Sequence, residues 1–282
     1  MLIPLELARE LFNMPETIDM PMHFLFPSDP VDPKQPDEQF RDQIDEMRRL
    51  GLGVSIVCLE ELGEGTCRVR SRIPSGATVV YRGWMLAPDD YEKLLALIQS
   101  YQASPFVSLQ SYLACHYLPN WYPLVAEFTA ETKIFPVGAD LTKELKILGS
   151  LGWERFFIKD HVKSLKTSVG SIVSRTEEIS FVLAEMRKFR GTIEGGICVR
   201  RFEEFVPDSE RRFFVINAVP HAMSGSVPEL VCECARRIKS PFFAVDVAPR
   251  VDGVLRLVEI GDGQVSDLVG WDVARFAQLW TE

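Results

Sequence analysis

The sequence lacks the features by which membrane proteins and nucleic-acid-binding proteins are recognised. It has no run of about 18 apolar residues, the length that a helix needs to cross a bilayer. Its net charge of −9 at pH 7 argues against an extended nucleic-acid footprint and leaves room only for one local basic groove. The N-terminal residues mix acidic and basic side chains and show no apolar export segment. We therefore expect a cytoplasmic protein whose partners are neither membranes nor nucleic acids.

Several short motifs of enzyme chemistry are also missing. No phosphate-binding loop ending in Gly-Lys-Ser/Thr occurs, and no Gly-x-Gly-x-x-Gly follows a strand-like run. There is no Gly-x-Ser-x-Gly and no His-Glu-x-x-His, and the four histidines lie far apart. Cys232 and Cys234 have no second Cys or His pair at zinc-ligand spacing. We therefore expect reduced thiols and no zinc, and nothing in the sequence indicates a Ser/His or Cys/His nucleophile.

What the sequence does contain is a globular composition arranged in two parts. With 282 residues, of which 46% are hydrophobic and 25% charged, the chain can bury one large core or two modest ones. Residues 22–28 and 54–59 are strand-like apolar runs, and residues 37–50 between them carry apolar side chains at helical spacing. Such a βαβ unit is typical of an open, mostly parallel sheet. From about residue 132 the pattern changes, so the predicted fold class is α/β followed by α+β.

The second part begins with a strand over residues 155–159 and a Ser/Lys/Gly-rich loop over 163–174. Thr176 precedes a helical pattern with acidic residues in its first turn, and Gly191 is its stop signal. Residues 197–205 and 211–219 are two further strand-like runs, and the Pro-Asp between them predicts that they pair as a hairpin.

Two carboxylates near the C-terminus are the most informative residues. The apolar runs 242–248 and 254–260 flank Asp252-Gly253, which is a strong signal for a two-residue type I′ turn. With these two residues at the centre of the turn, Asp246 lies directly opposite Glu259.

Alternation along a strand then places each carboxylate on an apolar face. Asp246 shares its face with Phe242 and Ala244, and Glu259 shares its face with Leu255 and Leu257. Two such charges about 4 Å apart repel by roughly 4 kcal/mol at an effective dielectric constant near 20. A cation would turn this repulsion into a binding site, and oxygen ligands alone favour Mg²⁺. The alternatives are one carboxyl group with a raised pKa, or a slipped register that puts one carboxylate in water.

Basic residues precede this acidic hairpin. Lys159 ends an apolar strand, where it is either a phosphate ligand or a solvated strand end. The loop 163–171 is rich in hydrogen-bond donors that suit phosphate, but its composition is also typical of a mobile surface loop. Arg200 and Arg201 follow a buried run, and guanidinium groups bind phosphate in a bidentate manner. In the predicted hairpin Glu203 faces Arg212, so an ordinary salt bridge is the alternative for that pair.

This order of a lysine loop, a basic strand and an acidic hairpin resembles the ATP-grasp superfamily, and most closely its clade named for two arginines and one lysine. The resemblance extends over about residues 145–270. Upstream, the likeness to a pre-ATP-grasp domain is looser and depends on the βαβ unit and on Tyr81-Arg82-Gly83-Trp84. The segments that carry the resemblance are Phe157-Ile158-Lys159, Glu210-x-Arg212-Phe-Phe-Val, Val245-Asp246-Val247-Ala248 and Val258-Glu259-Ile260-Gly261-Asp262-Gly263-Gln264-Val265-Ser266.

The resemblance implies a domain organisation. Residues 1–130 would form a Rossmann-like pre-ATP-grasp domain with a linker helix, and residues 131–282 a two-subdomain ATP-grasp fold. Within the latter, about 140–196 would be the lid subdomain and about 197–282 the C-terminal subdomain.

The resemblance also implies the ligands of the site residues. Lys159 and Arg212 would be catalytic, and Asp246, Glu259 and Asp262 would hold Mg²⁺. Many ATP-grasp enzymes carry Asn two residues after the metal-binding glutamate, where this chain has Gly261, so Asp262 or Gln264 would substitute for it. The residues implied to bind ATP are Lys159, Lys163, Arg200, Arg201, Phe202, Glu203 and Arg212.

A reaction class follows from the same resemblance. It implies an ATP- and Mg²⁺-dependent ligase that joins a carboxylate to an amine or thiol through an acylphosphate, with small-molecule or peptide substrates. Arg82, at the end of a predicted strand, would hold the substrate carboxylate, with a structural ion pair as the alternative. The rival function is an ATP-binding assembly factor or chaperone without turnover, similar to the ATP-grasp proteins that help build translation initiation complexes, and a third is a degenerate nucleotide-binding domain. The oligomeric state stays open.

Overall fold

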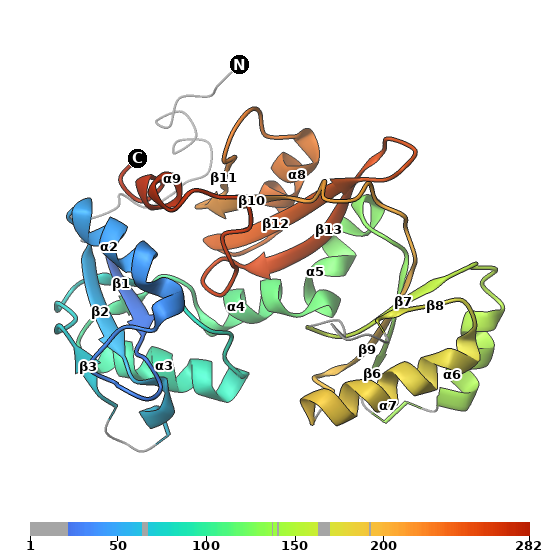
Figure 1. The fold of residues 1–282 in the computed structure, drawn as a ribbon, viewed down its shortest axis with the longest axis horizontal. Helices are drawn as coiled ribbons and strands as arrows, with labels where there is room; N and C mark the ends of the chain where they lie inside the picture. The colour runs from blue at the N-terminus through green and yellow to red at the C-terminus, as the bar shows by residue number, and fades with distance from the viewer. Residues whose placement is uncertain (1–21, 64–66, 137, 140, 163–169, 192) are drawn as a thin grey trace.

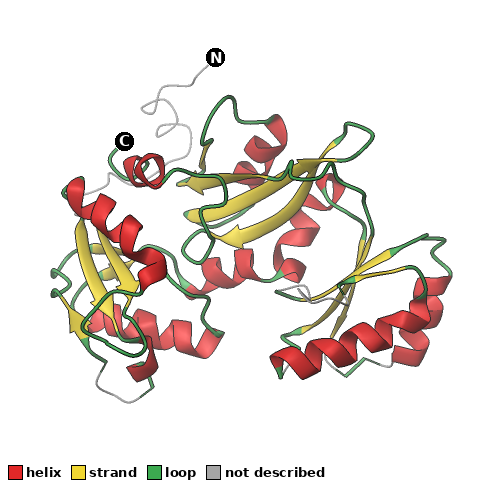
Figure 2. Cartoon of the chain, viewed as in Figure 1, coloured by secondary structure: helices red, strands yellow, loops and turns green. Residues whose placement is uncertain are grey.

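Three β-sheets with helices packed on them make up the described part of the chain (Figures 1 and 2). A computed structural model describes residues 22–63, 67–136, 138–139, 141–162, 170–191 and 193–282. Within these ranges, no helix combines the length and the apolar composition that crossing a membrane would require. In Figure 1 the C-terminal sheet lies between the N-terminal sheet on the left and a third sheet, which we call the outer sheet, on the right.

The N-terminal sheet has the order β3-β2-β1-β4-β5, in which β1 pairs in parallel with both β2 and β4. The short helix η1 and helix α2 connect β1 to β2; η1 buries Phe40, and α2 buries Ile44 and Met47, which are residues of the predicted helical pattern. The predicted βαβ unit is therefore confirmed. The elements of this part are β1 Met22–Pro27, η1 Glu38–Phe40, α2 Arg41–Arg49, β2 Gly53–Val57, η2 Leu59–Glu61, β3 Val69–Arg70, β4 Thr78–Tyr81, α3 Pro88–Ser100 and β5 Ser104–Pro105.

The outer sheet is antiparallel, with the order β6-β9-β7-β8. Phe156, Ile158, Ile197 and Val199 form the apolar face that packs on the helices of this part. The sheet takes β6 and β9 from outside the range predicted for the lid, because the central strand β9 pairs with both β6 and β7. Its elements are β6 Thr132–Pro136, α6 Leu141–Gly149, β7 Phe156–Asp160, β8 Ile172–Val173, η4 Thr176–Glu178, α7 Ile179–Arg190 and β9 Gly196–Arg201.

The C-terminal sheet is antiparallel, with the order β11-β10-β12-β13. One face, which includes Phe213 and Phe243, packs against α4, α5 and α8. The other face, which includes Phe214 and Phe242, shares a core with α9 and the N-terminal sheet. Residues from both sides of the domain boundary predicted at residue 130 therefore pack in one core. The elements are α4 Leu109–His116, α5 Leu118–Val125, η3 Ala126–Phe128, β10 Arg211–Ile216, β11 Val219–His221, α8 Glu229–Arg237, β12 Phe242–Pro249, β13 Leu255–Asp262 and α9 Val273–Gln278.

The hairpin predicted from residues 197–205 and 211–219 is wrong. β9 lies in the outer sheet and β10 pairs with β12 and β11 in the C-terminal sheet. The two strands are therefore buried in different sheets, and the segment between them connects one sheet to the other. Local turn residues gave the prediction, whereas the long-range partners of each strand decide the pairing.

The turn between β12 and β13 also differs from the prediction. Gly253 has φ +85°, but Asp252 does not have the positive φ that a type I′ turn requires. The Gly253 N–H donates to the Arg250 carbonyl (2.8 Å) and the Arg250 N–H to the Val254 carbonyl (2.9 Å), which closes a three-residue loop. A β-bulge at Val258 then shifts the register by one residue and sets Asp246 opposite Glu259, as predicted.

Candidate active site

The two opposed carboxylates of the C-terminal sheet are each paired with a cation. Arg212, the neighbour of Asp246 on β10, binds it in a bidentate manner, with Nε to Oδ1 at 2.7 Å and Nη2 to Oδ2 at 2.6 Å. Lys159 reaches across from β7 of the outer sheet, and its Nζ donates to Glu259 Oε1 at 2.6 Å. The repulsion expected between the carboxylates is thus offset by two protein cations, and Lys159 is a buried residue rather than a solvated strand end.

The environment treats the two carboxyl groups differently. Burial raises the pKa of Asp246, and the hydrogen bonds and charge of Arg212 oppose this rise without cancelling it. Burial also acts to raise the pKa of Glu259, but the charge and hydrogen bond of Lys159, with Arg200 and Arg212, leave it lowered. The Glu259 side chain is 42% exposed, whereas that of Asp246 is 5% exposed. Glu259 is therefore the more accessible member of the pair, and its surroundings favour its ionised form more than those of Asp246 do.

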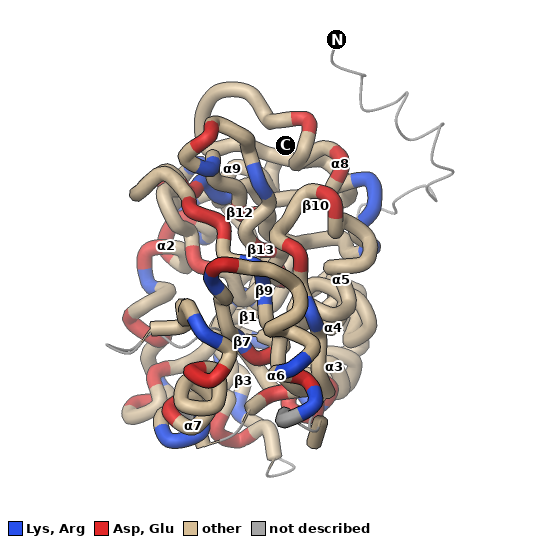
Figure 3. Tube along the Cα trace, turned by 90° about the vertical axis from the view of Figure 1, so that its right-hand side faces the viewer, with Lys and Arg blue, Asp and Glu red and all other residues tan. Residues whose placement is uncertain are grey.

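The outer sheet presents two neighbouring basic residues to β13. Lys159 pairs with Cys198 and Arg200 pairs with Phe157, so Lys159 and Arg200 are diagonal neighbours on one face. Lys159 binds Glu259, and Arg200 Nη1 donates to the carbonyl of the preceding residue, Val258, at 3.0 Å. Figure 3 shows basic positions of β7 and β9 in the same central region as acidic positions of β13. The two sheets are thus joined at the predicted phosphate site.

The other predicted ATP ligands on this segment have separate surroundings. Arg201 is exposed at the end of β9, and the Arg155 guanidinium lies 4.0 Å from the centroid of the Phe202 ring. Glu203 is bound by Arg256, at 3.1 and 3.2 Å, rather than by Arg212, so the predicted Glu203–Arg212 pair is wrong. Lys163 lies outside the described residues.

Arg82 is not placed to bind a substrate carboxylate. Its side chain is 1% exposed, and Nη1 donates to the carbonyls of Gly263 (2.7 Å), Gln264 (3.1 Å) and Ser266 (2.9 Å). Nε and Nη2 donate to Gln43 Oε1 at 3.2 and 2.9 Å. Burial lowers its pKa to about 10. The prediction that Arg82 is a substrate ligand is therefore wrong, because these donors already join the N-terminal sheet to the segment after β13.

Asp262 does not join Asp246 and Glu259. It pairs with Phe243, which places its side chain on the opposite face of the sheet. It is fully buried; Oδ1 accepts from the N–H and the side-chain amide of Gln264 at 3.0 and 3.2 Å, and Oδ2 has no hydrogen-bond partner among the described residues. Burial raises its pKa to about 7. The predicted three-carboxylate metal site is thus not formed, and the ranges that the structure describes contain no cluster of three or more metal-ligating side chains.

A stability prediction follows for Asp262. Between about pH 4 and pH 7 the folded chain keeps a proton that the unfolded chain has lost, so this group lowers the stability as the pH rises through that window. Asp262→Asn should flatten this dependence and raise the free energy of unfolding at pH 8 by about 2 kcal/mol. Urea unfolding at pH 5 and pH 8 measures both effects, with the exposed Asp208→Asn as the control. A variant equally destabilised at both pH values would contradict the prediction.

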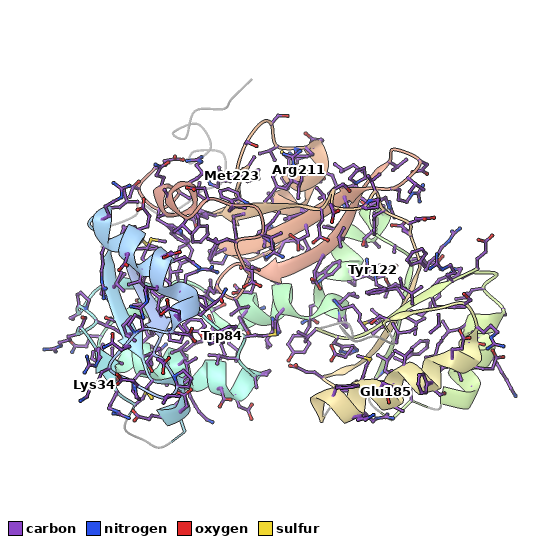
Figure 4. The ribbon with its side chains drawn as sticks, viewed as in Figure 1. Lys34, Trp84, Tyr122, Glu185, Arg211 and Met223 are labelled. Carbon is purple, nitrogen blue, oxygen red and sulfur yellow. The ribbon has the colours of Figure 1, made fainter. Side chains whose placement is uncertain are left out.

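Sequence reasoning missed Thr129, which completes the junction between the sheets. Its Oγ1 donates to the Leu257 carbonyl at 2.7 Å and accepts from Arg200 Nη2. Tyr122 lies in the same junction, where its hydroxyl accepts from the Thr132 N–H at 3.0 Å (Figure 4). Neither residue lies in a motif, and Thr129 is far from Leu257 in the sequence, so no local signal could have identified this contact.

Comparison with protein families gives one match. Residues 150–282 match a family of ATP-grasp domains, described as family 3 of the clade named for two arginines and one lysine. No curated protein sequence matches the chain.

Solved structures with the same fold cover nearly the whole chain at low sequence identity. D-cycloserine synthetase DcsG is 13% identical with a TM-score of 0.62, over 92% of this chain and 98% of that one. The D-alanine-D-alanine ligase from Coxiella burnetii is 12% identical with a TM-score of 0.59, over 88% and 87%. The ATP-grasp ligase PsnB with its precursor peptide PsnA2 and AMPPNP is 10% identical with a TM-score of 0.56, over 94% and 97%, and another PsnB complex contains Mg and ADP.

Proposed function

Because residues 150–282 match a family of ATP-grasp domains of the clade named for two arginines and one lysine, we propose that the protein is an ATP- and Mg²⁺-dependent ligase that joins a carboxylate to an amine or thiol. The observation that carries the proposal is the set of four charged side chains from three different regions of the chain. Asp246 and Glu259 face each other on adjacent strands, and Arg212 and Lys159 neutralise them. Cations that bind carboxylates here are equally suited to the phosphates of ATP.

The donor set fits Mg²⁺ with ATP. Two opposed carboxylates supply hard oxygen ligands, and Mg²⁺ usually takes one or two carboxylates and completes its shell with substrate phosphates and water. Asp246 and Glu259 would hold the ion, which when bound would neutralise charge on the phosphates. Lys159 and Arg212 would then exchange their carboxylate partners for phosphate oxygens.

In the reaction we propose, the γ-phosphoryl group moves to a substrate carboxylate. The bond from the γ-phosphorus to the bridging oxygen breaks, ADP leaves with that oxygen, and a substrate carboxylate oxygen bonds to phosphorus. An amine nitrogen then attacks the acyl carbon, phosphate departs with the carbon–oxygen bonding pair, and the nitrogen loses a proton. Positioning and charge neutralisation by Lys159 and Arg212 suffice for these steps, so no protein nucleophile is needed.

The N-terminal part would complete the substrate site. Its parallel strands have the order β2-β1-β4-β5, and we interpret this sheet as the Rossmann-like pre-ATP-grasp domain. The outer sheet would act as the lid subdomain. By analogy with the proteins of the same fold, we propose small-molecule or peptide carboxylates and amines as substrates.

ADP release tests this function. We expect ADP formation only when ATP, Mg²⁺, a carboxylate and an amine are all present, in screens of amino acids and short peptides by a coupled ADP assay. Asp246→Asn should reduce turnover at least 100-fold, since it removes one of the two proposed metal ligands. Tight ATP binding without ADP release for any acceptor would instead favour an assembly factor that binds a partner protein.

A further inference from the structure

The opposition of Asp246 and Glu259 depends on one irregularity in β13. From the turn up to Leu257, β13 pairs with β12 in a register that would place Val258 opposite Asp246 and Glu259 opposite Val245. In that register Glu259 would lie on the face of Leu257, inside the core formed with α5 and α8. The bulge at Val258 moves Glu259 to the other face and directly opposite Asp246.

Two buried side chains hold the backbone on both sides of this bulge. Arg200 Nη1 donates to the Val258 carbonyl at 3.0 Å, and Thr129 Oγ1 donates to the Leu257 carbonyl at 2.7 Å. Arg200 Nη2 also donates to Thr129 Oγ1, so the two side chains support each other. We call Arg200 and Thr129 the bulge clamp.

The surroundings of Arg200 favour this role over contact with ATP. The residue is only 8% exposed, and its hydrogen bonds, including the one to the bulge carbonyl, go to protein atoms at the junction of the two sheets. Its burial lowers the pKa of its guanidinium, a cost that a surface phosphate ligand would not incur. Its neighbour Lys159 reaches further, to the Glu259 carboxylate itself.

We propose that Arg200 is a positioning residue: together with Thr129 it fixes the Val258 bulge and thereby sets Asp246 and Glu259 opposite each other as a metal-binding pair. The inference rests on the proposed function for the identity of the ligand, Mg²⁺ with ATP. Because β9 carries Arg200, the clamp also makes the geometry of the metal pair dependent on the position of the outer sheet.

Calorimetric ATP titrations with Mg²⁺ and with EDTA test the proposal. Arg200→Met should weaken binding of ATP in the presence of Mg²⁺ by 10- to 100-fold, the usual loss when a residue that orients a metal ligand is removed. Its affinity for ATP in EDTA should stay within about twofold of the wild type. Thr129→Val should show the same selective loss at a smaller size, and Arg200→Lys should restore part of it. Lys133→Met, which removes a half-buried cation from β6, is the control.

A second measurement does not need ATP. In the ligand-free protein, NMR should show backbone contacts between Asp246 and Glu259 in the wild type and their weakening in Arg200→Met and Thr129→Val. Persistence of these contacts in both variants would overturn the proposal, and so would an equal loss of ATP affinity with and without Mg²⁺, which would make Arg200 an ATP ligand. A wild type that binds no ATP would contradict the proposed function alone, because the NMR comparison would still decide the role of the clamp.

Discussion

Glu259→Gln is expected to abolish Mg²⁺-dependent ATP binding, with a loss of affinity of at least 100-fold. The substitution keeps the size of the side chain and an oxygen that can accept from Lys159, but it removes the charge that a divalent cation needs. It also leaves Asp246, whose pKa is raised by burial and whose oxygens are bound by Arg212, as the only carboxylate of the pair. One carboxylate so engaged is a poor metal ligand on its own.

The comparison requires calorimetry with and without Mg²⁺ on the variant and on a matched control. Glu233→Gln removes an ion-paired glutamate from α8 and should bind ATP as the wild type does. Because Lys159 loses its charged partner in Glu259→Gln, binding of ATP in EDTA should be retained or slightly strengthened. Unchanged Mg²⁺-dependent binding in this variant would contradict the metal role of Glu259 and leave the domain without the proposed chemistry.

The sequence predicted the central pair of this site by a partly incorrect route. The two-residue turn expected at Asp252-Gly253 is a three-residue loop, which alone would move Glu259 away from Asp246 by one position. The bulge at Val258 compensates for this shift. Glu259 therefore has the predicted partner, but it does not share a face with Leu257 as predicted. Turn signals are local, whereas this bulge is fixed by Arg200 and Thr129 from other parts of the chain.

Contacts between segments that are distant in the sequence could not be predicted from it. The βαβ unit and the helix that Gly191 caps depend on local periodicity and were predicted closely. Lys159 and Glu259 are 100 residues apart, and only the packing of two sheets brings them together. Arg82 was misassigned for the same reason, since its partners Gly263, Gln264 and Ser266 lie far along the chain. A charged residue at a strand end suggests a ligand site until its buried partners are known.

Arg82→Met is expected to lower the free energy of unfolding by about 4 kcal/mol. The methionine fills part of the space but leaves three carbonyls of residues 263–266 without their donor, and each unpaired buried group costs about 1–3 kcal/mol. Relief from burying the guanidinium charge offsets part of this sum. Arg82→Lys should rescue little, because an ammonium group cannot also reproduce the planar contact with Gln43.

Thermal unfolding followed by circular dichroism would measure the loss, which corresponds to about 10 °C for a chain of this size. Arg70→Met is the matched control, since Arg70 is exposed and donates one hydrogen bond to the Lys34 carbonyl; it should change the stability by less than about 0.5 kcal/mol. A substrate-binding Arg82 would behave in the opposite way, with unchanged stability and a raised KM. Measurements on this one variant thus distinguish the two roles. A stable Arg82→Met protein would contradict the structural role and support a role of Arg82 in substrate binding. A destabilised one would show that a buried cation holds the N-terminal sheet to the segment after β13. Arg212, which binds Asp246, also donates from Nη1 to the Asp267 carbonyl of that segment at 2.6 Å, so the proposed metal pair and the N-terminal part would keep a fixed relation.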